Sequence, residues 1–282
     1  MASLAFEGLA GLEDLAADPA PRRRRRRPRI WRVVVLLLAG AYFFIPLYAG
    51  LRFSFIDNAG HPSLYAVKAI PSQVGFTDAF VLSLKLAAVT LVLTMLLMVP
   101  TTIYVHLRLP RLRRLLEFVT ILPIVIPPIV LILGVLRAAP LALKASPYLL
   151  SLVYVILSMP FVYRSLDSGL AAIDLKTLVE ASRSLGGNWV KTLWRVVLPN
   201  LRTGLLSAAV LTLALVLGEF TMASLDLWTT LPVWIYQFQQ VDAHVSTAVS
   251  MVSLVGTWLL ITLIVSLDRS QSRRARRRTN NS

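Results

Sequence analysis

Few side chains in this sequence have the type and setting to do chemistry, and Glu219 is the most informative of them. It lies inside an apolar run near residues 203–225. A charged group within a bilayer is costly and usually faces a water-filled path or an oppositely charged partner. Two interpretations stay open. Glu219 lines a path and attracts a cationic solute, or it forms a structural ion pair with Lys85. Gly218 beside it permits close helix contact or a local distortion.

Two more carboxylates flank the segment that follows, residues 226–244. Asp226 and Asp242 could together make an acidic mouth, or they are ordinary solvated loop charges. We keep Asp226 with Glu219 as the candidate path residues. No catalytic residue is predicted.

A different group of residues has the spacing of a docking element. Glu180-Ala181-Ser182 is followed by Gly186, and then by Leu198-Pro199. Thr177 is predicted to cap a short helix, with Glu180 three residues later completing a capping box. Leu178, Ala181, Ser182 and Leu185 then share one face of small or apolar side chains.

The end of this element is predicted from its glycines and its proline. Gly186 can take the positive φ that ends a helix, and Asn188 can cap the next one. Pro199 should push Leu198 out of the α region and close the second helix. A compact helix of this kind, on the water side of a membrane, suits docking into a groove on another protein.

Other chemistry is excluded by composition. The chain has no cysteine, which rules out disulfides, thiol catalysis and cysteine-ligated metals. Its three histidines, His61, His106 and His244, are far apart in the sequence. We therefore predict no metal site, and we interpret the histidines as ordinary interfacial residues.

The elements that must position these residues are membrane spans. Hydrophobic residues make up 56% of the chain, and the mean hydropathy is +0.70. Six apolar runs approach the ~20 residues that cross a bilayer as a helix. They lie near 33–55, 80–105, 115–136, 147–163, 203–225 and 245–267. The prediction is an all-α integral membrane protein with one six-helix domain.

The basic residues predict the orientation of these spans. Of 29 Lys and Arg, 24 fall in four segments on one side, 1–32, 106–114, 164–202 and 268–282. By the positive-inside rule, that side and both termini are cytoplasmic. The arginine runs 22–27 and 273–278 then lie beside anionic lipid headgroups, and a role in nucleic-acid binding is not predicted.

The domain boundaries follow from the spans and charges. Residues 1–30 are predicted to be a disordered basic cytoplasmic tail, and residues 269–282 a second basic tail. Residues 31–268 form the membrane domain, with a cytoplasmic loop at about 165–201. The first apolar run is too long, and lacks the small-residue cleavage site, for a removed signal peptide.

Three details of the membrane domain are also predicted. Pro123, Pro127 and Pro128 should kink the third span. The outer segment 56–79 should pack as an irregular cap. The outer loop 226–244 is amphipathic and carries aromatic residues that suit a membrane interface.

The docking element resembles the E-A-A-x3-G-x9-I-x-L-P signature of bacterial ABC importer permeases of the binding-protein-dependent kind. The departures are Ser182 for the second alanine and Val196 for isoleucine, while the spacing from glycine to proline matches. The resemblance covers roughly residues 80–270. It implies the type I permease architecture, with a core of about five helices plus an extra first helix.

The resemblance also implies partners and a division of labour. Residues Thr177, Glu180, Ala181, Ser182, Gly186, Leu198 and Pro199 would form the contact with an ATPase. This chain lacks a G-x-x-x-x-G-K-[ST] loop, so ATP and Mg²⁺ would be held by a separate ATPase and no cofactor is expected here. A second, homologous but different permease chain and an extracytoplasmic solute-binding protein complete the implied complex, in the inner membrane of a bacterium.

Substrate and mechanism leave alternatives. The stretches Leu217-Gly218-Glu219-Phe220-Thr221 and 121–127 look like permeases grouped with spermidine and putrescine importers, so a polyamine is the first expectation. Iron(III) or an oxyanion is the alternative. An ion-driven secondary transporter would need matching carboxylates or broken helices in two halves, which the sequence lacks. A membrane enzyme is disfavoured because no span carries a serine–histidine pair or paired aspartates.

Overall fold

The computed structural model describes residues 30–57 and 59–279. The predicted tail at residues 1–30 lies outside the described residues except for Ile30. The chain divides into two compact units, Met1–Tyr48 and Ala49–Ser282. The first contributes most of one apolar helix, and the second holds every other element described below.

Helices are the regular elements of the described residues. In a bilayer this is the expected solution, because a helix satisfies its own backbone hydrogen bonds. They are α2 (Ile30–Ser54), α3 (Tyr65–Ala69), η2 (Ile70–Ser72), α4 (Phe76–Arg108), η3 (Pro110–Leu112), α5 (Arg113–Val125), α6 (Pro128–Ala138), α7 (Leu141–Lys144), α8 (Tyr148–Ala171), α9 (Leu175–Ser184), α10 (Trp189–Thr192), the π-helix η4 (Leu193–Val197), α11 (Leu198–Asn200), α12 (Arg202–Leu217), α13 (Thr221–Leu225), α14 (Leu231–Phe238) and α15 (Ala243–Thr279).

Four of the six predicted spans are found as single helices in the described residues, and the other two fall on helix pairs that are sharply bent. The single helices are Trp31–Ser54, Phe76–Arg108, Tyr148–Ala171 and Ala243–Leu263. The other two are bent pairs of helices, so the chain is an all-α membrane protein with up to six spans. The last helix does not end at the predicted boundary near residue 268, because α15 continues to Thr279.

The third span is broken rather than kinked. The segment Pro110–Val125 and helix α6 meet at an angle of 100°. Ile126 between them has extended backbone (ψ 122°), as expected of a residue before proline, and Pro127 has no N–H to continue the helix. The predicted proline effect is therefore found at Pro127 and Pro128, where it is larger than a kink, whereas Pro123 lies inside α5, which continues to Val125.

The fifth span is shorter than predicted. Helix α12 ends at Leu217, with Gly218 as its C-cap, and the short helix α13 follows after a break. Glu219 therefore lies in a helix break instead of in the continuous 203–225 helix that we predicted. The outer segments differ as well. Residues 56–79 contain α3 and η2, and the loop 226–244 contains α14.

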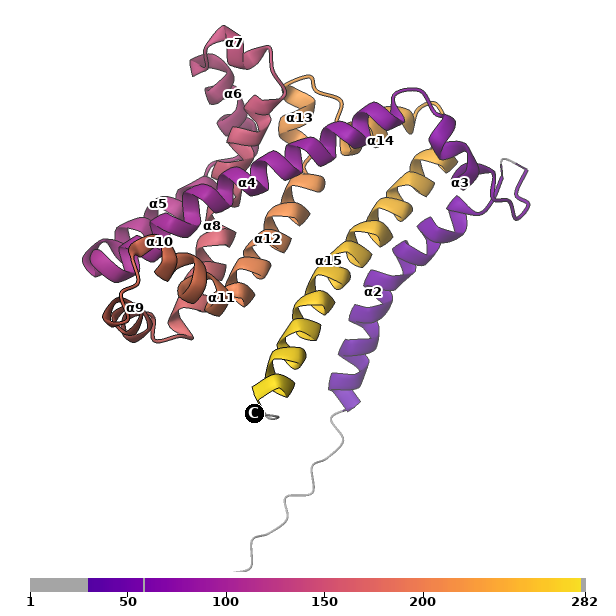
Figure 1. The fold of residues 1–282 in the computed structure, drawn as a ribbon. Coiled ribbons are helices and arrows are strands. Elements are labelled where there is room, and N and C mark those ends of the chain that lie inside the picture. Colours follow the sequence, from indigo (N-terminus) through magenta and orange to yellow (C-terminus); the bar gives the residue numbers. More distant parts are fainter. Residues whose placement is uncertain (1–29, 58, 280–282) are drawn as a thin grey trace, which may run out of the picture. The chain divides into compact units, whose positions relative to one another are not determined.

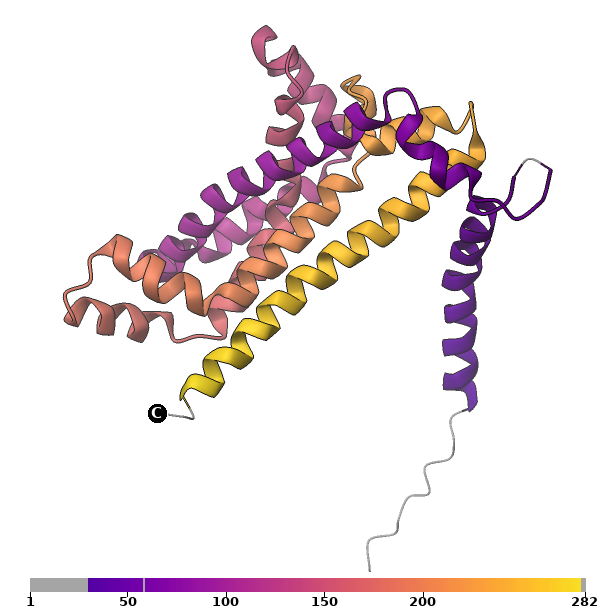
Figure 2. The same cartoon turned by 45° about the vertical axis from the view of Figure 1, so that its right-hand side comes forward.

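Helix α8 is central to the second unit. It contacts α4 and α12 along their lengths, and α5 as well (Figure 1). One apolar cluster surrounds Tyr163 at its C-terminal end and another surrounds Tyr154 nearer its N-terminus. Figure 2 shows α9 to α11 at one end of these helices and α13 and α14 at the other. The docking element and the Glu219 break are therefore at opposite ends of one bundle.

The closest approach in this bundle joins α8 to α12 through two glycines. A Cβ added to Gly204 would lie 3.0 Å from the carbonyl oxygen of Ser165 and 3.4 Å from the Cα of Gly169. A Cβ added to Gly169 would lie 3.2 Å from the Cα of Gly204. Small residues let helix backbones approach in this way within membranes. The two helices can therefore pack backbone to backbone.

This contact predicts the effect of one added methyl group. Gly204→Ala should lower the free energy of unfolding by about 1–3 kcal/mol, the usual range for overpacking a tight contact. Gly134→Ala is the control, since an added Cβ there meets nothing within 4 Å and alanine favours helix by up to ~1 kcal/mol. Thermal unfolding of the detergent-solubilised protein measures both. Equal stability of the two variants would contradict the tight α8–α12 contact.

Candidate functional site

The docking helix α9 begins at a different cap from the one predicted. Asp174 is the N-cap, and its carboxylate accepts hydrogen bonds from the N–H of Thr177 at 3.2 Å and from its hydroxyl at 2.7 Å. These hydrogen bonds lower the pKa of the Asp174 carboxyl. The predicted capping box of Thr177 and Glu180 is wrong, because Thr177 is already inside the helix. Glu180 instead lies one turn after Lys176, and its Oε1 atom is 3.9 Å from the Nζ atom of that lysine.

The predicted face of α9 is largely open to solvent. Leu175 and Val179 are buried against the rest of the chain. Ala181 is exposed and Leu185 is 89% exposed, while Leu178 and Ser182 are half-buried. The hydroxyls of Ser182 and Thr192 share a hydrogen bond of 2.8 Å that ties α9 to α10. Helix α9 is therefore ordered and keeps apolar side chains exposed.

The turn after α9 forms as predicted. Gly186 has φ +77°, a conformation that side chains other than glycine rarely adopt. Gly187 is constrained by space, since an added Cβ would lie 2.7 Å from the carbonyl oxygen of Ser182. The side chain of Asn188 caps the next helix by accepting the N–H of Lys191 at 2.8 Å. The predicted roles of Gly186 and Asn188 are confirmed.

The segment from Trp189 to Asn200 ends differently from the prediction. Leu198 is helical (φ −60°, ψ −42°), so Pro199 does not push it out of the α region. The backbone instead widens to a π-helix over Leu193–Val197, and the helical path continues to Asn200. The wider turn fits a proline, which lacks an N–H and crowds the preceding turn. The chain then bends by 76° into α12.

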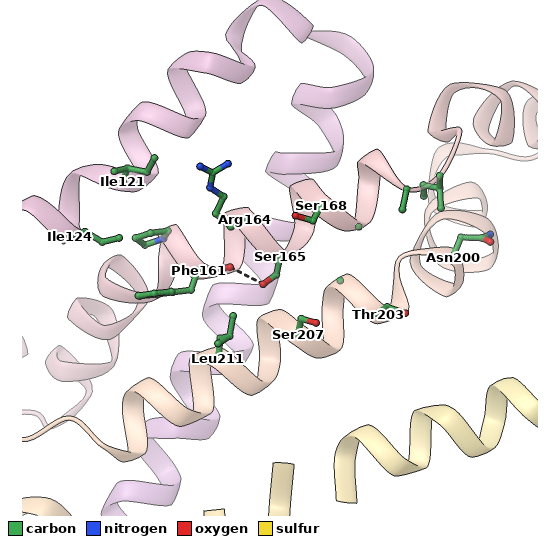
Figure 3. A pocket seen from close by; sticks show the side chains of 15 residues that line it. Ile121, Ile124, Phe161, Arg164, Ser165, Ser168, Asn200, Thr203, Ser207 and Leu211 are labelled. Carbon is green, nitrogen blue, oxygen red and sulfur yellow. Dashed lines mark hydrogen bonds between the residues drawn. The ribbon is translucent and has the colours of Figure 1, made fainter. Parts of the chain in front are cut away.

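A polar groove lies beside this segment and is lined by α5, α8, α11 and α12 (Figure 3). Its volume is about 850 Å³. Polar side chains from α8 (Arg164, Ser165, Ser168), α11 (Asn200) and α12 (Thr203, Ser207) share it with apolar ones such as Phe161 and Leu211. No carboxylate is among its lining residues.

The hydroxyls of this groove have capacity for a ligand. Ser165 donates to the carbonyl of Phe161 at 2.9 Å within its own helix. Ser168, Thr203 and Ser207 are exposed, and each offers a donor and an acceptor toward the groove. A polar group facing lipid without a partner is costly. This groove therefore faces water or another protein. These residues were not predicted, although hydroxyls one turn apart in an apolar span are a signal that the sequence contains.

Ion pairs flank the C-terminal end of α8, and they were not predicted from the sequence either. Asp167 lies 2.9 Å from the Nε2 atom of His106 on α4 and 2.7 Å from the Nη2 atom of Arg113 on α5. Arg164 lies 3.2 Å from Glu117. His106 is thus more than an interfacial residue, because it joins α4 to α8. The sequence does contain a signal for these ion pairs, because the charged residues come at the ends of successive spans.

Glu219 is held by three donors in the break after α12. Its carboxylate accepts the hydroxyl of Tyr154 at 2.8 Å and the N–H groups of Met222 at 2.7 Å and Ala223 at 3.2 Å. Lys85 is exposed, and the described residues show no ion pair between it and Glu219. Of the two interpretations left open, the ion pair with Lys85 is therefore not formed. A buried tyrosine and the start of α13 are the partners instead.

Asp226 differs from Glu219 in its partners. Its Oδ2 atom is buried and has no hydrogen-bond partner among the described residues. Burial raises the pKa of the Asp226 carboxyl to about 6. Leu227 beside it has φ +60° and is 89% exposed. Asp226 lies with Glu219 at the end of the bundle opposite α9 (Figure 2), and the lining of the polar groove includes neither.

Comparisons with known proteins agree with these features. Residues 98–279 match the model of the family described as binding-protein-dependent transport system inner membrane component. The molybdenum transport system permease protein ModB of Mycobacterium tuberculosis is 29% identical over 245 residues, 78% of this chain and 91% of that protein.

Two further relatives are named for similar systems. A probable molybdenum ABC transporter permease protein of Haloferax volcanii is 31% identical over 266 residues, 86% of this chain and 95% of that protein. The sulfate transport system permease protein CysW of Synechococcus elongatus is 32% identical over 123 residues, 41% of this chain and 42% of that protein. With the family model matched over most of the chain, this protein belongs to the binding-protein-dependent inner membrane components, the permeases of ABC importers.

Proposed function

We propose that this chain is the permease subunit of an ATP-driven importer for a small oxyanion of the molybdate or sulfate class. The relatives support this proposal, since the three described above are named for molybdenum and sulfate transport, while a relative named for ferric transport keeps iron(III) as the alternative. They give no support to a polyamine, our first expectation from the sequence, and they favour the oxyanion alternative.

The chemistry of the polar groove supports the same substrate class. An oxyanion needs hydrogen-bond donors and positive charge, and the groove offers the hydroxyls of Ser168, Thr203 and Ser207 beside the guanidinium of Arg164. No carboxylate is among the lining residues, and a carboxylate that approaches them, that of Glu117, pairs with Arg164 at 3.2 Å. We therefore assign the wall of the translocation path to this groove.

Glu219 then has a different task from the one first expected. Its three donors leave it little capacity for a solute. We infer that it holds the start of α13 against α8 through Tyr154. Asp226 remains a candidate for the outer mouth of the path, since its carboxylate is short of partners.

Partners follow from the family. Permeases of this kind work with an ATPase and a solute-binding protein. In this proposal the exposed face of α9 docks on the ATPase, which carries ATP and Mg²⁺. A second permease chain covers the open groove and completes the path. The membrane is that of a bacterial cell, with both termini in the cytoplasm.

Coupling would run from α9 into the bundle. ATPase closure can shift the transporter only if α9 makes different contacts in the two ATPase states. α9 connects to α8 through residues 172–174, and Asp167 on α8 holds α4 and α5 through His106 and Arg113. Movement of α9 would thereby reach the helix that carries Arg164 and Ser168.

Topology is tested with single cysteines, because the chain has none of its own. Leu185 and Leu227 are each 89% exposed, so they are matched in access. In whole cells that express the permease without its ATPase, an impermeant thiol reagent should label Leu227→Cys and should not label Leu185→Cys until the membrane is opened. The reverse pattern would place the termini outside.

Docking of α9 is tested at Gly186. Gly186→Val places a β-branched residue at φ +77°, a strain of about 1–3 kcal/mol. We expect ATPase binding to weaken by roughly tenfold, which corresponds to ~1.4 kcal/mol. Gly60→Val is the matched control, because Gly60 also has positive φ (+84°) but lies in another loop. Co-purification of the ATPase measures both. Equal loss in the two variants would argue against docking through α9.

Substrate class and path are tested at Arg164. Arg164→Gln should reduce uptake of labelled molybdate and sulfate about tenfold or more, since a hydrogen bond to a charged group contributes roughly 1.5–3 kcal/mol. Arg164→Lys should recover part of it. Uptake is measured in vesicles containing the whole complex and its binding protein.

Glu117→Gln is the control for this test, because it removes the partner of Arg164 and keeps the guanidinium. It should leave oxyanion uptake near normal. If both variants lose uptake equally, the ion pair is structural and Arg164 does not contact the solute. Uptake of labelled spermidine in place of the oxyanions would overturn the proposed substrate class.

A further inference from the structure

A second groove lies along another side of α4, and its chemistry changes along its length. One part, about 450 Å³, is lined wholly by apolar side chains, including Leu91 and Leu96 on α4, Trp194 on η4 and Leu206 on α12. The adjoining part, about 340 Å³, is lined by Thr101, Tyr104 and Trp189 among others. Pro100 and Leu193 line both parts, so the two parts adjoin, and we treat them as one groove.

The apolar part has the length of one bilayer leaflet. It extends along α4 from Leu91 to Pro100, nine residues or about 13 Å at 1.5 Å per residue. Half of the ~30 Å hydrocarbon core is about 15 Å. The polar and aromatic part continues toward Val105, at the end of α4 that is followed by Arg108 and Arg111. Its tyrosine and tryptophan are typical of the membrane interface.

A positive charge stands at the polar end. Lys191, Trp194 and Leu198 are spaced by three and four residues, so they lie near one face of the helical segment after α9. Trp194 and Leu198 line the apolar part, and Lys191 lies one turn earlier, next to the region of Trp189. Lys191 is exposed, and the described residues give its side chain no ion pair. Along the groove, the ammonium group of Lys191 is therefore followed by aromatic side chains and then by aliphatic ones.

We propose that this groove binds one anionic phospholipid of the cytoplasmic leaflet, with an acyl chain between Leu91 and Pro100 and the headgroup phosphate at Lys191. An acyl chain fits a lining with no polar side chain, and Tyr104 and Trp189 lie at the level of the glycerol and headgroup. The site rests on the proposed topology, which the cysteine labelling tests separately, and not on the substrate.

The location of this lipid gives it an effect on coupling. One wall of the groove is η4, which follows the docking helix after the Gly186 turn and α10. A lipid seated there fills the space between η4, α4 and α12. Removing it would leave Trp194, already 67% exposed, with fewer contacts. The lipid therefore stabilises the position of the segment that anchors α9.

The test is native mass spectrometry of the purified complex in detergent, titrated with phosphatidylglycerol or with phosphatidylcholine of the same acyl chains. Phosphatidylglycerol should be retained more strongly. Leu206→Trp, which fills the apolar part, should lose the retained lipid. Leu84→Trp is the matched control, since Leu84 is exposed on α4 and lies outside both linings.

A second variant tests the headgroup contact without crowding the groove. Lys191→Gln should reduce the preference for phosphatidylglycerol about fivefold, the effect of about 1 kcal/mol for one lysine near an anionic surface, and should keep binding of phosphatidylcholine. Lys68→Gln, on the opposite side of the predicted topology, should change nothing. Unchanged lipid retention in both Leu206→Trp and Lys191→Gln would overturn the proposal, as would a second protein chain cross-linked at Leu206 in place of lipid.

Discussion

The contact between α8 and α12 at Gly169 and Gly204 is the constraint on which the rest of the second unit depends. The two backbones are so close there that a Cβ on Gly204 would lie 3.0 Å from the carbonyl oxygen of Ser165, so only glycine fits without a shift. The same register places Ser168 on α8 and Thr203 on α12 along one groove. The α8 end that forms this contact also carries Asp167, which fixes α4 and α5. Packing of two small residues thus sets the position of the polar wall and of the docking helix.

The breaks in the spans show how this chain provides hydrogen-bond partners for backbone groups where a helix is interrupted. At Ile126 the break follows from Pro127, and at Pro199 the helix widens to a π-turn, with the side-chain amide of Asn200 donating to the carbonyl of Val196 at 2.7 Å. At Glu219 a carboxylate accepts two N–H groups that the break leaves without helical partners. Each irregularity has a side chain or a backbone shift that compensates for it.

The sequence was sufficient for the features that depend on local chemistry. Six apolar runs coincide with four single helices and two bent helix pairs, and Gly186 and Asn188 predicted their turn because φ sign and capping are local properties. It was insufficient where two local solutions compete. Thr177 and Asp174 can both cap a helix start, and the aspartate three residues earlier wins. Pro199 can end a helix or be absorbed by a wider turn.

Contacts between distant residues were the least predictable. The partner of Glu219 is Tyr154, 65 residues away, whereas charge alone favoured Lys85 from the same half of the bundle. The polar groove combines hydroxyls from spans that nothing in the sequence pairs. Only the register set at Gly169 and Gly204 brings them to one side, and that register depends on three-dimensional packing.

The docking helix is joined to the bundle by very short connections. Three residues, 172–174, separate α8 from α9, and four, 185–188, separate α9 from α10. Both connections are themselves hydrogen-bonded, for example from Ile173 to Leu170 and from Gly187 to Ser182. Residues inserted at either junction would lengthen and loosen the connection, so a displacement of α9 would reach α8 only in part. If α9 moves with a partner, junctions of this length would pass its displacement on to α8 with little loss.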